Sequence, residues 1–383
     1  MIFENDDEGK LPDGKEMGRF LAMMQRQIPV QHIMPMERIV SNEDAYVLTK
    51  LSNGRYSIKP NITHQGLLYY GNCDFESVKK GLKPRFYQKP KFVEELGHGD
   101  FLEYNVLLEQ FKLLVETFPL YKLLNEGVEV SPRLTIRIGN PYSLASAYGL
   151  KTPFMNLTSD IDVAMFYATH RYNENTQEFE AVDEGLGIVY TYVLPLQFGL
   201  IPGLSTLGKQ VFYRTFFNKQ FLLSLNINDD FNKNKLVSGF TFRHSQEGAD
   251  FYGKMFKNGE FLIPKDDFLL TKWKSYDKII FRDALINNLK SNPHDDITEN
   301  TRILEGRGFT IKEGGPKFVK EDLAGIDLLK IWEELCDDLV ASEYVRNSAV
   351  DFLEQVPDME KYKSYFNVNL YAEFKLQMQR NSY

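Results

Sequence analysis

The chain has 383 residues, of which 53 are acidic and 45 are basic, giving a formal net charge of −8. This balance argues against a general nucleic-acid binder, which carries a basic surface. Hydrophobic residues make up 43% of the chain and aromatic residues 14%, enough for a packed, aromatic-rich core. This length predicts two or three domains, or one large domain with extensions.

Cysteine and histidine are too sparse to predict a disulfide framework or a metal site. Cys73 and Cys336 lie far apart, and no Cys-x-x-Cys or His-x-x-x-His pair occurs. The N-terminus lacks the apolar run of a secretion signal, and prolines interrupt the longest uncharged stretch, residues 185–208. We therefore expect a soluble, cytoplasmic protein without a metal or a membrane partner, and its oligomeric state stays open.

The first predicted elements are a helix, a hairpin and a strand that ends on a glycine. Residues 13–27 have a helical pattern, and residues 45–60 predict two strands around an Asn53-Gly54 turn. The segment Leu67-Leu68-Tyr69-Tyr70 predicts a strand that stops at Gly71, followed by a short helix. A glycine there permits close approach of a ligand, although an ordinary strand-to-turn glycine is the alternative.

The middle of the chain alternates helices with one strand. Residues 101–118 predict a helix because apolar residues recur every three or four positions. A further helix is expected to end at Gly149, with a strand through residues 154–155 after it. Thr158 or Ser159 is then expected to cap a second helix.

The remaining segments complete a mixed order of elements. Residues 186–270 read as strand-rich, with strands at 187–194, 220–227 and 259–266, and the chain turns helical after about residue 320. Strands and helices do not alternate regularly, so we predict an α+β fold. Three regions are expected: an N-terminal extension at 1–60, a core domain at 61–315 and a helical C-terminal region at 316–383.

Three short motifs together resemble those of ADP-ribosyltransferases. The Tyr-Gly strand end resembles their first motif, with Tyr70 where that pattern has His, and Asn-Leu-Thr-Ser-Asp resembles their Ser-Thr-Ser segment. The strand predicted at Gly-Glu-Phe-Leu-Ile-Pro would place Glu260 at their catalytic carboxylate position. The resemblance implies an NAD site where Glu260 stabilises positive charge on the ribose and Tyr70 contacts the cofactor. Gly71 would let the backbone reach nicotinamide, while Thr158 or Ser159 would orient the ribose.

A second resemblance covers residues 60–310 and is to the FRG-domain family. Its central signature is similar to residues 140–168, where Tyr148 and Thr158 are among the matches, and its Phe/Tyr-Arg-Gly motif would fall on Tyr69-Tyr70-Gly71. The family's third segment would fall on residues 243–251, which makes Glu247 a rival to Glu260 for the catalytic carboxylate. The implied cofactor contacts are Tyr69, Gly71, Tyr148, Thr158 and Ser159.

The chain departs from the FRG pattern at its polar positions. Tyr70 replaces the family's Arg, Ser146-Ala147 its Gln-His pair, Asn156 its Asp and Leu157 its Trp. The leading hypothesis is an NAD-binding ADP-ribosyltransferase or NAD glycohydrolase with an ADP-ribosyltransferase-like core. Its expected partners are a small-molecule nucleotide and, for a transferase, a protein that accepts ADP-ribose. A toxin or defence role would be consistent with it by analogy. The alternative is an inactive binding module on the same fold.

Overall fold

The computed structural model describes most of the chain as far as residue 331. The described residues are 2–3, 11–27, 46–50, 56–60, 67–87, 98–126, 128–131, 134–137, 141–173, 176–193, 204–206, 211–212, 214, 220–264, 267–293, 295–328 and 330–331. Cys336 and the predicted Asn53-Gly54 turn lie outside them.

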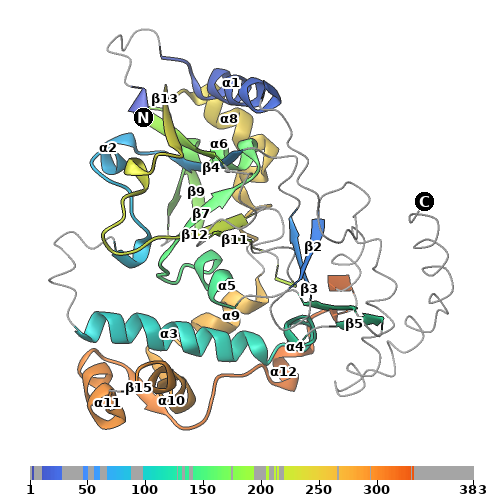
Figure 1. The fold of residues 1–383 in the computed structure, drawn as a ribbon, viewed down its shortest axis with the longest axis vertical. Helices are drawn as coiled ribbons and strands as arrows, with labels where there is room; N and C mark the ends of the chain where they lie inside the picture. Colours follow the sequence, from blue (N-terminus) through green and yellow to red (C-terminus); the bar gives the residue numbers. More distant parts are fainter. Residues whose placement is uncertain are drawn as a thin grey trace.

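A seven-stranded sheet forms the centre of the described structure (Figure 1). Its strand order is β1-β13-β10-β4-β7-β12-β11, and every neighbouring pair is antiparallel except β1 with β13. The strands are β1 (Ile2–Phe3), β4 (Leu67–Asn72), β7 (Phe154–Thr158), β10 (Leu186–Val193), β11 (Leu204–Thr206), β12 (Gln220–Ser224) and β13 (Val237–Arg243).

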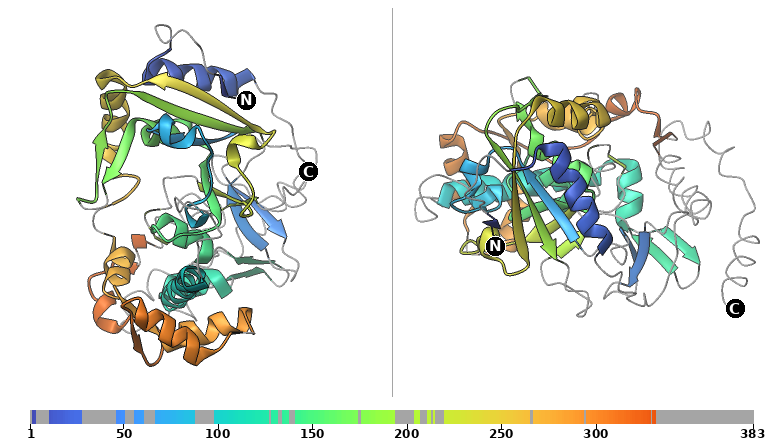
Figure 2. Two further views of the ribbon diagram at one scale, coloured as in Figure 1. Left: turned by 90° about the vertical axis from the view of Figure 1, so that its left-hand side faces the viewer. Right: turned by 90° about the horizontal axis from the view of Figure 1, so that it is seen from above.

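Each face of this sheet carries its own apolar core. Helices α1 (Gly14–Gln27), α6 (Ile161–Thr169) and α8 (Gln246–Met255) cover one face, where Leu21 and Phe166 are fully buried. The short helices α2 (Phe75–Val78) and η6 (Phe231–Lys233) cover the other face, packing around the buried Phe231. Figure 2 shows the long strands β10 and β13 lying side by side beneath α1.

A smaller helical layer lies along α3 (His98–Glu116), below the sheet in Figure 1. Helices α10 (Arg282–Ser291) and α11 (Ile297–Gly306) pack on α3 together with the parallel pair β14 (Ile279–Phe281) and β15 (Thr310–Lys312). Within this layer the fully buried Gln110 joins α3 to β14, because its amide donates to the Ile279 carbonyl and accepts from the Phe281 N–H.

The remaining elements include a second sheet, a hairpin and several short helices. The second sheet has four strands, in the order β2 (Tyr46–Lys50), β3 (Tyr56–Pro60), β6 (Leu134–Arg137) and β5 (Val128–Ser131). The hairpin consists of β8 (His170–Asn173) and β9 (Glu178–Ala181). The helices are η3 (Arg85–Tyr87), α4 (Pro119–Glu126), α5 (Pro141–Ala147), η7 (Lys257–Gly259), α9 (Phe268–Lys274) and α12 (Lys320–Leu323). Since β3 pairs with β6, the second sheet crosses the boundary expected at residue 60.

The α+β prediction is confirmed, as are the helices at 13–27 and 101–118 and the strands at 187–194 and 220–227. The strand predicted at 259–266 is wrong. Asn258 and Gly259 both adopt positive φ, and the N–H of Ile263 donates to the Gly259 carbonyl, so a tight turn uses groups that a strand needs for pairing. Helix α8 was also missed within the segment read as strand-rich, although Ser245 caps it by accepting from the Gly248 N–H.

The expected cap of α6 also needs correction. Asp160 caps the helix, its carboxylate accepting from the N–H of Asp162 at 2.9 Å. Thr158 lies two residues before this cap, and its Oγ1 accepts from the Asp160 N–H at 3.0 Å. The hydroxyl therefore fixes the turn that leads into the helix.

Candidate functional site

A cavity of about 680 Å³ opens where β4 separates from β7. Strand β4 has one edge that faces β10 and one that faces β7. Along the β10 edge it pairs continuously, from Leu67 opposite Val193 to Asn72 opposite Ile188. Toward β7 it pairs at one position, Tyr69 opposite Thr158. Residues 70–73 and 154–157 therefore diverge, and both segments line the cavity.

The β4 wall includes Tyr70, for which the sequence predicts a cofactor contact. Its ring packs on Tyr190 and Phe231, with ring centroids 6.2 and 6.3 Å away. Burial raises the pKa of the Tyr70 hydroxyl above its ordinary value, so it remains protonated at neutral pH. Asn72 lies beside it, with its amide nitrogen 3.5 Å from the hydroxyl oxygen.

Gly71 has a structural role that the sequence did not reveal. A Cβ at this position would lie 1.8 Å from the backbone oxygen of Ala164 in α6. The glycine lets α6 approach β4 closely on the side of the helix-covered core. Its backbone also lines the cavity, but helix packing is sufficient reason for a glycine here.

A second wall comes from the end of α5 and from β7. Gly149 adopts φ +83, and the N–H of Leu150 donates to the Ala145 carbonyl, which ends the helix and turns the chain toward β7. This turn leaves Ser146 facing Asn156, and the Ser146 hydroxyl donates to the Asn156 side-chain oxygen at 2.6 Å. Both residues line the cavity.

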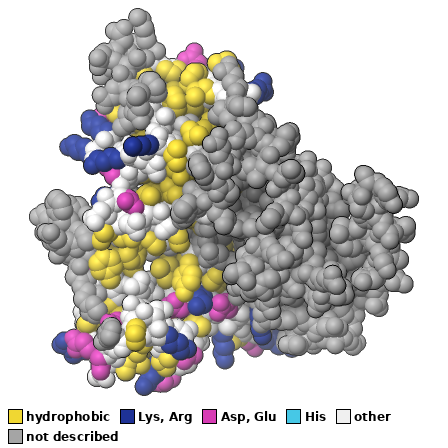
Figure 3. All heavy atoms as spheres, in the orientation of Figure 1, with side chains coloured by type: hydrophobic (Ala, Val, Ile, Leu, Met, Phe, Trp, Pro, Cys, Tyr) yellow, Lys and Arg dark blue, Asp and Glu magenta, His cyan; other side chains and the backbone are white. Residues whose placement is uncertain are grey.

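The charge of the cavity is strongly one-sided. Its described lining includes Lys83, Arg85, Arg171, Arg214 and Lys274, whereas no Asp or Glu occurs among the described residues that line it. The whole chain has a net charge of −8, so this concentration of cations runs against the overall composition. Lys and Arg side chains also gather at the height of α2 on the face drawn in Figure 3, whereas both signs mix over α10 and α11.

Arg214 is the most deeply placed of these cations. It is 6% exposed, and its Nε lies 3.2 Å from a carboxylate oxygen of Asp267, which is 2% exposed. The guanidinium carbon lies 5.2 Å from the centre of the Tyr148 ring. The other carboxylate oxygen of Asp267 caps α9 by accepting from the Leu270 N–H at 2.9 Å. One carboxylate therefore connects Arg214 to the helix that supplies Lys274.

Protonation states in this wall follow from burial. Burial, together with the nearby Asp267 carboxylate, raises the pKa of Tyr148 well above its ordinary value. Burial also raises the pKa of Asp267, and the Leu270 N–H and Arg214 act against that rise. The raised pKa keeps the Tyr148 phenol neutral at neutral pH, and Arg214 beside Asp267 favours the charged form of that carboxylate.

Cys73 also lines the cavity, near Arg171. Burial raises the pKa of its thiol even though the Arg171 guanidinium favours the thiolate. A thiol held protonated is a weak nucleophile. The Cys73 carbonyl is 2.8 Å from Nε2 of the buried His244, so this segment is anchored through its backbone.

The predicted carboxylates lie elsewhere. Glu260 follows η7 in an exposed turn, and Glu247 lies in the first turn of α8, where it accepts from Lys15 at 2.8 Å. Neither lines the cavity. Ser159 is 5% exposed and likewise outside the lining, whereas Tyr69, Tyr70, Gly71, Tyr148 and Thr158 all contribute to it.

The positions aligned with the polar residues of the FRG pattern converge on this cavity. Tyr70, Ser146, Ala147, Asn156 and Leu157 all line it. The segment aligned with the third FRG motif, residues 243–251, does not contribute to its described lining. The segments that resemble the first two FRG motifs therefore line one cavity, and the segment that resembles the third does not.

Sequence reasoning missed the cations of the site. Lys83 and Arg85 precede and begin η3, Arg171 lies in β8, Arg214 lies between β11 and β12, and Lys274 ends α9. No local spacing joins residues so far apart in the chain. They meet at the cavity because elements far apart in the chain pack together.

Two further properties concern the described residues. No helix among them is long and apolar enough to span a bilayer. Within the same part of the chain, no three His, Cys, Asp or Glu side chains are grouped as metal ligands.

No family model matches the chain, and comparisons with curated proteins and with solved structures find no match either. Functional inference therefore rests on the geometry of the cavity.

Proposed function

We propose that the cavity binds a phosphorylated nucleotide of the NAD class, and that ligand recognition is the main function of this domain. The observation that carries the proposal is the charge of the wall: five Lys and Arg side chains line it, and no Asp or Glu does so among the described residues. An anionic ligand gains from such a surface, and a cationic ligand is repelled by it.

The size and aromatic lining of the cavity support a ligand with a ring system. Its volume of about 680 Å³ falls within the usual range for small-molecule sites. Tyr70, Tyr148, Tyr167, Tyr172 and Phe179 contribute aromatic side chains to the walls. Such side chains provide stacking surfaces for a nucleobase or a nicotinamide ring.

Cleavage of the nicotinamide–ribose bond is the second candidate. Convergence of Tyr70, Ser146 and Asn156 on one cavity favours it, because these residues occupy the positions of the polar FRG residues. Its mechanism needs a group that stabilises positive charge on the ribose, usually a carboxylate. The positions of Glu260 and Glu247 outside the lining therefore favour binding over turnover.

The test is a calorimetric titration of purified protein with NAD, ADP-ribose and AMP, followed by an assay for released nicotinamide. We expect saturable binding with one ligand per chain and no release of nicotinamide. Glu260→Gln and Glu247→Gln are matched charge controls, and each should bind within about 2-fold of wild type because exposed charges contribute little. Absence of binding by all three nucleotides would refute the proposal. Turnover lost in Glu260→Gln would instead establish the enzyme.

A further inference from the structure

The buried end of the cavity contains an ion pair that the fold alone does not explain. Arg214 and Asp267 are both more than nine-tenths buried, and Arg214 lines the cavity. Removing two charges from water costs about as much as their attraction returns, so a buried ion pair is a weak source of stability. A cavity-lining arginine held by such a pair is instead arranged as a binding group.

The geometry around Arg214 holds its guanidinium in one orientation. Asp267 pairs with Nε at 3.2 Å, and the Tyr148 ring lies 5.2 Å from the guanidinium carbon. Asp267 is itself held in place because it caps α9. An arginine oriented in this way loses little side-chain entropy when it binds an anion, and its planar donors match the oxygens of a phosphate.

We propose that Arg214 forms a phosphate subsite at the buried end of the cavity, with Asp267 as its positioning residue. This inference rests on the proposed binding of a phosphorylated nucleotide. Gln220, which is 7% exposed and pairs with Thr158 across β12 and β7, lines the same cavity and adds a polar amide. Arg85 is exposed, and water screens its charge more strongly than that of Arg214.

The subsite makes ADP-ribose, ADP and AMP better ligands than adenosine, which has no phosphate. Substituting Arg214→Lys keeps the positive charge and removes the planar fork, and we expect roughly 10- to 100-fold weaker binding of ADP-ribose. Arg302→Lys is the matched control, because Arg302 is an exposed arginine of α11 that does not line the cavity, and we expect a change of about 2-fold or less.

The experiment measures binding of these four probes by calorimetry and follows the ³¹P resonances of ADP-ribose by NMR. In wild type we expect a shifted, broadened ³¹P signal, and this perturbation should shrink in Arg214→Lys and persist in Arg302→Lys. The double variant Arg214→Met with Asp267→Asn removes both charges and retains a capping side chain, so it should remain folded and lose phosphate recognition.

The outcomes separate the two proposals. If wild type binds none of the probes, the proposed function fails. If wild type binds ADP-ribose while Arg214→Lys and the folded double variant bind it equally well, nucleotide binding stands and the Arg214 subsite is refuted. Equal affinity of wild type for adenosine and AMP would refute the subsite in the same way.

Discussion

The two edges of strand β4 differ sharply although they belong to the same six residues. Toward β10 the strand pairs at six consecutive positions, and toward β7 at one. The closed edge stabilises the sheet, and the open edge leaves room for a cavity lined by cations. A strand can thus serve the fold along one edge and a ligand along the other, so its residues need to be assigned edge by edge.

The largest expected effect concerns the contact between β4 and helix α6 at Gly71. In Gly71→Ala the new methyl group would meet the Ala164 backbone oxygen at 1.8 Å, so α6 or β4 must move. We expect a loss of roughly 3 kcal/mol or more in the free energy of unfolding, measured by urea denaturation. Gly306→Ala is the control, because nothing lies within 4 Å of a Cβ there, and it should be neutral or slightly stabilising.

Tyr69 tests the edge of β4 that faces β7, where it lies opposite Thr158. Its hydroxyl is fully buried at the cavity and makes no hydrogen bond to the part of the chain that the structure describes. Tyr69→Phe should raise the free energy of unfolding of the ligand-free protein by about 1 kcal/mol, because an unpaired polar group is removed. If that hydroxyl serves the ligand, the same variant should bind ADP-ribose more weakly. Lower stability would show that the hydroxyl has a partner within the fold.

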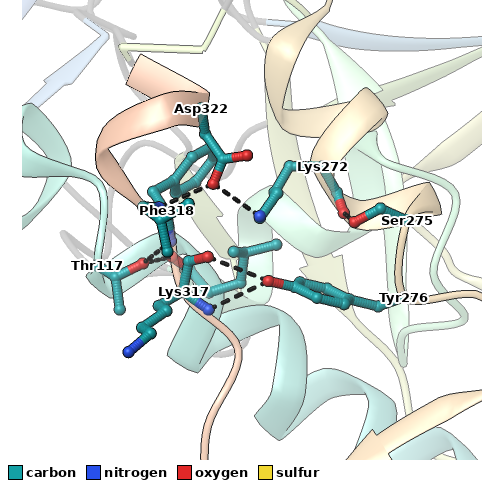
Figure 4. Close-up of polar contacts among 9 residues, drawn as sticks. Thr117, Lys272, Ser275, Tyr276, Lys317, Phe318 and Asp322 are labelled. Carbon is teal, nitrogen blue, oxygen red and sulfur yellow. Dashed lines mark hydrogen bonds and ion pairs between the residues drawn. The ribbon is translucent and has the colours of Figure 1, made fainter. Parts of the chain in front are cut away.

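The wall that carries Lys274 depends on contacts made by residues 317–322 (Figure 4). Lys272 in α9 pairs with Asp322 at 2.6 Å, and the Tyr276 hydroxyl donates to the Lys317 carbonyl at 3.0 Å. A double-mutant cycle with Lys272→Met and Asp322→Asn should give a coupling free energy of about 1 kcal/mol, since both side chains are partly buried. Arg282 and Glu313 form a more exposed pair, for which we expect weaker coupling.

The smallest effect is a loss of stability in mild acid. Burial lowers the pKa of His244 and of His170 below the ordinary value of 6.5. The unfolded chain therefore binds protons that the folded protein does not, and stability falls as the pH drops below about 6.5 toward the folded pKa. Urea denaturation at about pH 7.5 and about pH 5.5 should show this loss. His244→Gln cannot titrate, so it should lose less stability between these pH values, and an unchanged loss would contradict the assignment.

Local patterns predicted most of the regular elements, and tertiary contacts decided the rest. The helix at 101–118 and the strand at 187–194 follow from periodicity and composition, and both are confirmed. The strand expected around Glu260 failed because positive φ at Asn258 and Gly259 turns the chain back. Arg214 and Asp267 carried no sequence signal, since their pairing depends on how α9 is placed.

Hydrogen–deuterium exchange with and without ADP-ribose tests the central claim most directly. The account predicts slower exchange on binding in residues 72–73, 83–85 and 146–150, which line the cavity. Residues 246–261, which carry Glu247 and Glu260, should exchange unchanged. Protection confined to residues 246–261, with none at the open edge, would contradict the assignment of this cavity as the binding site.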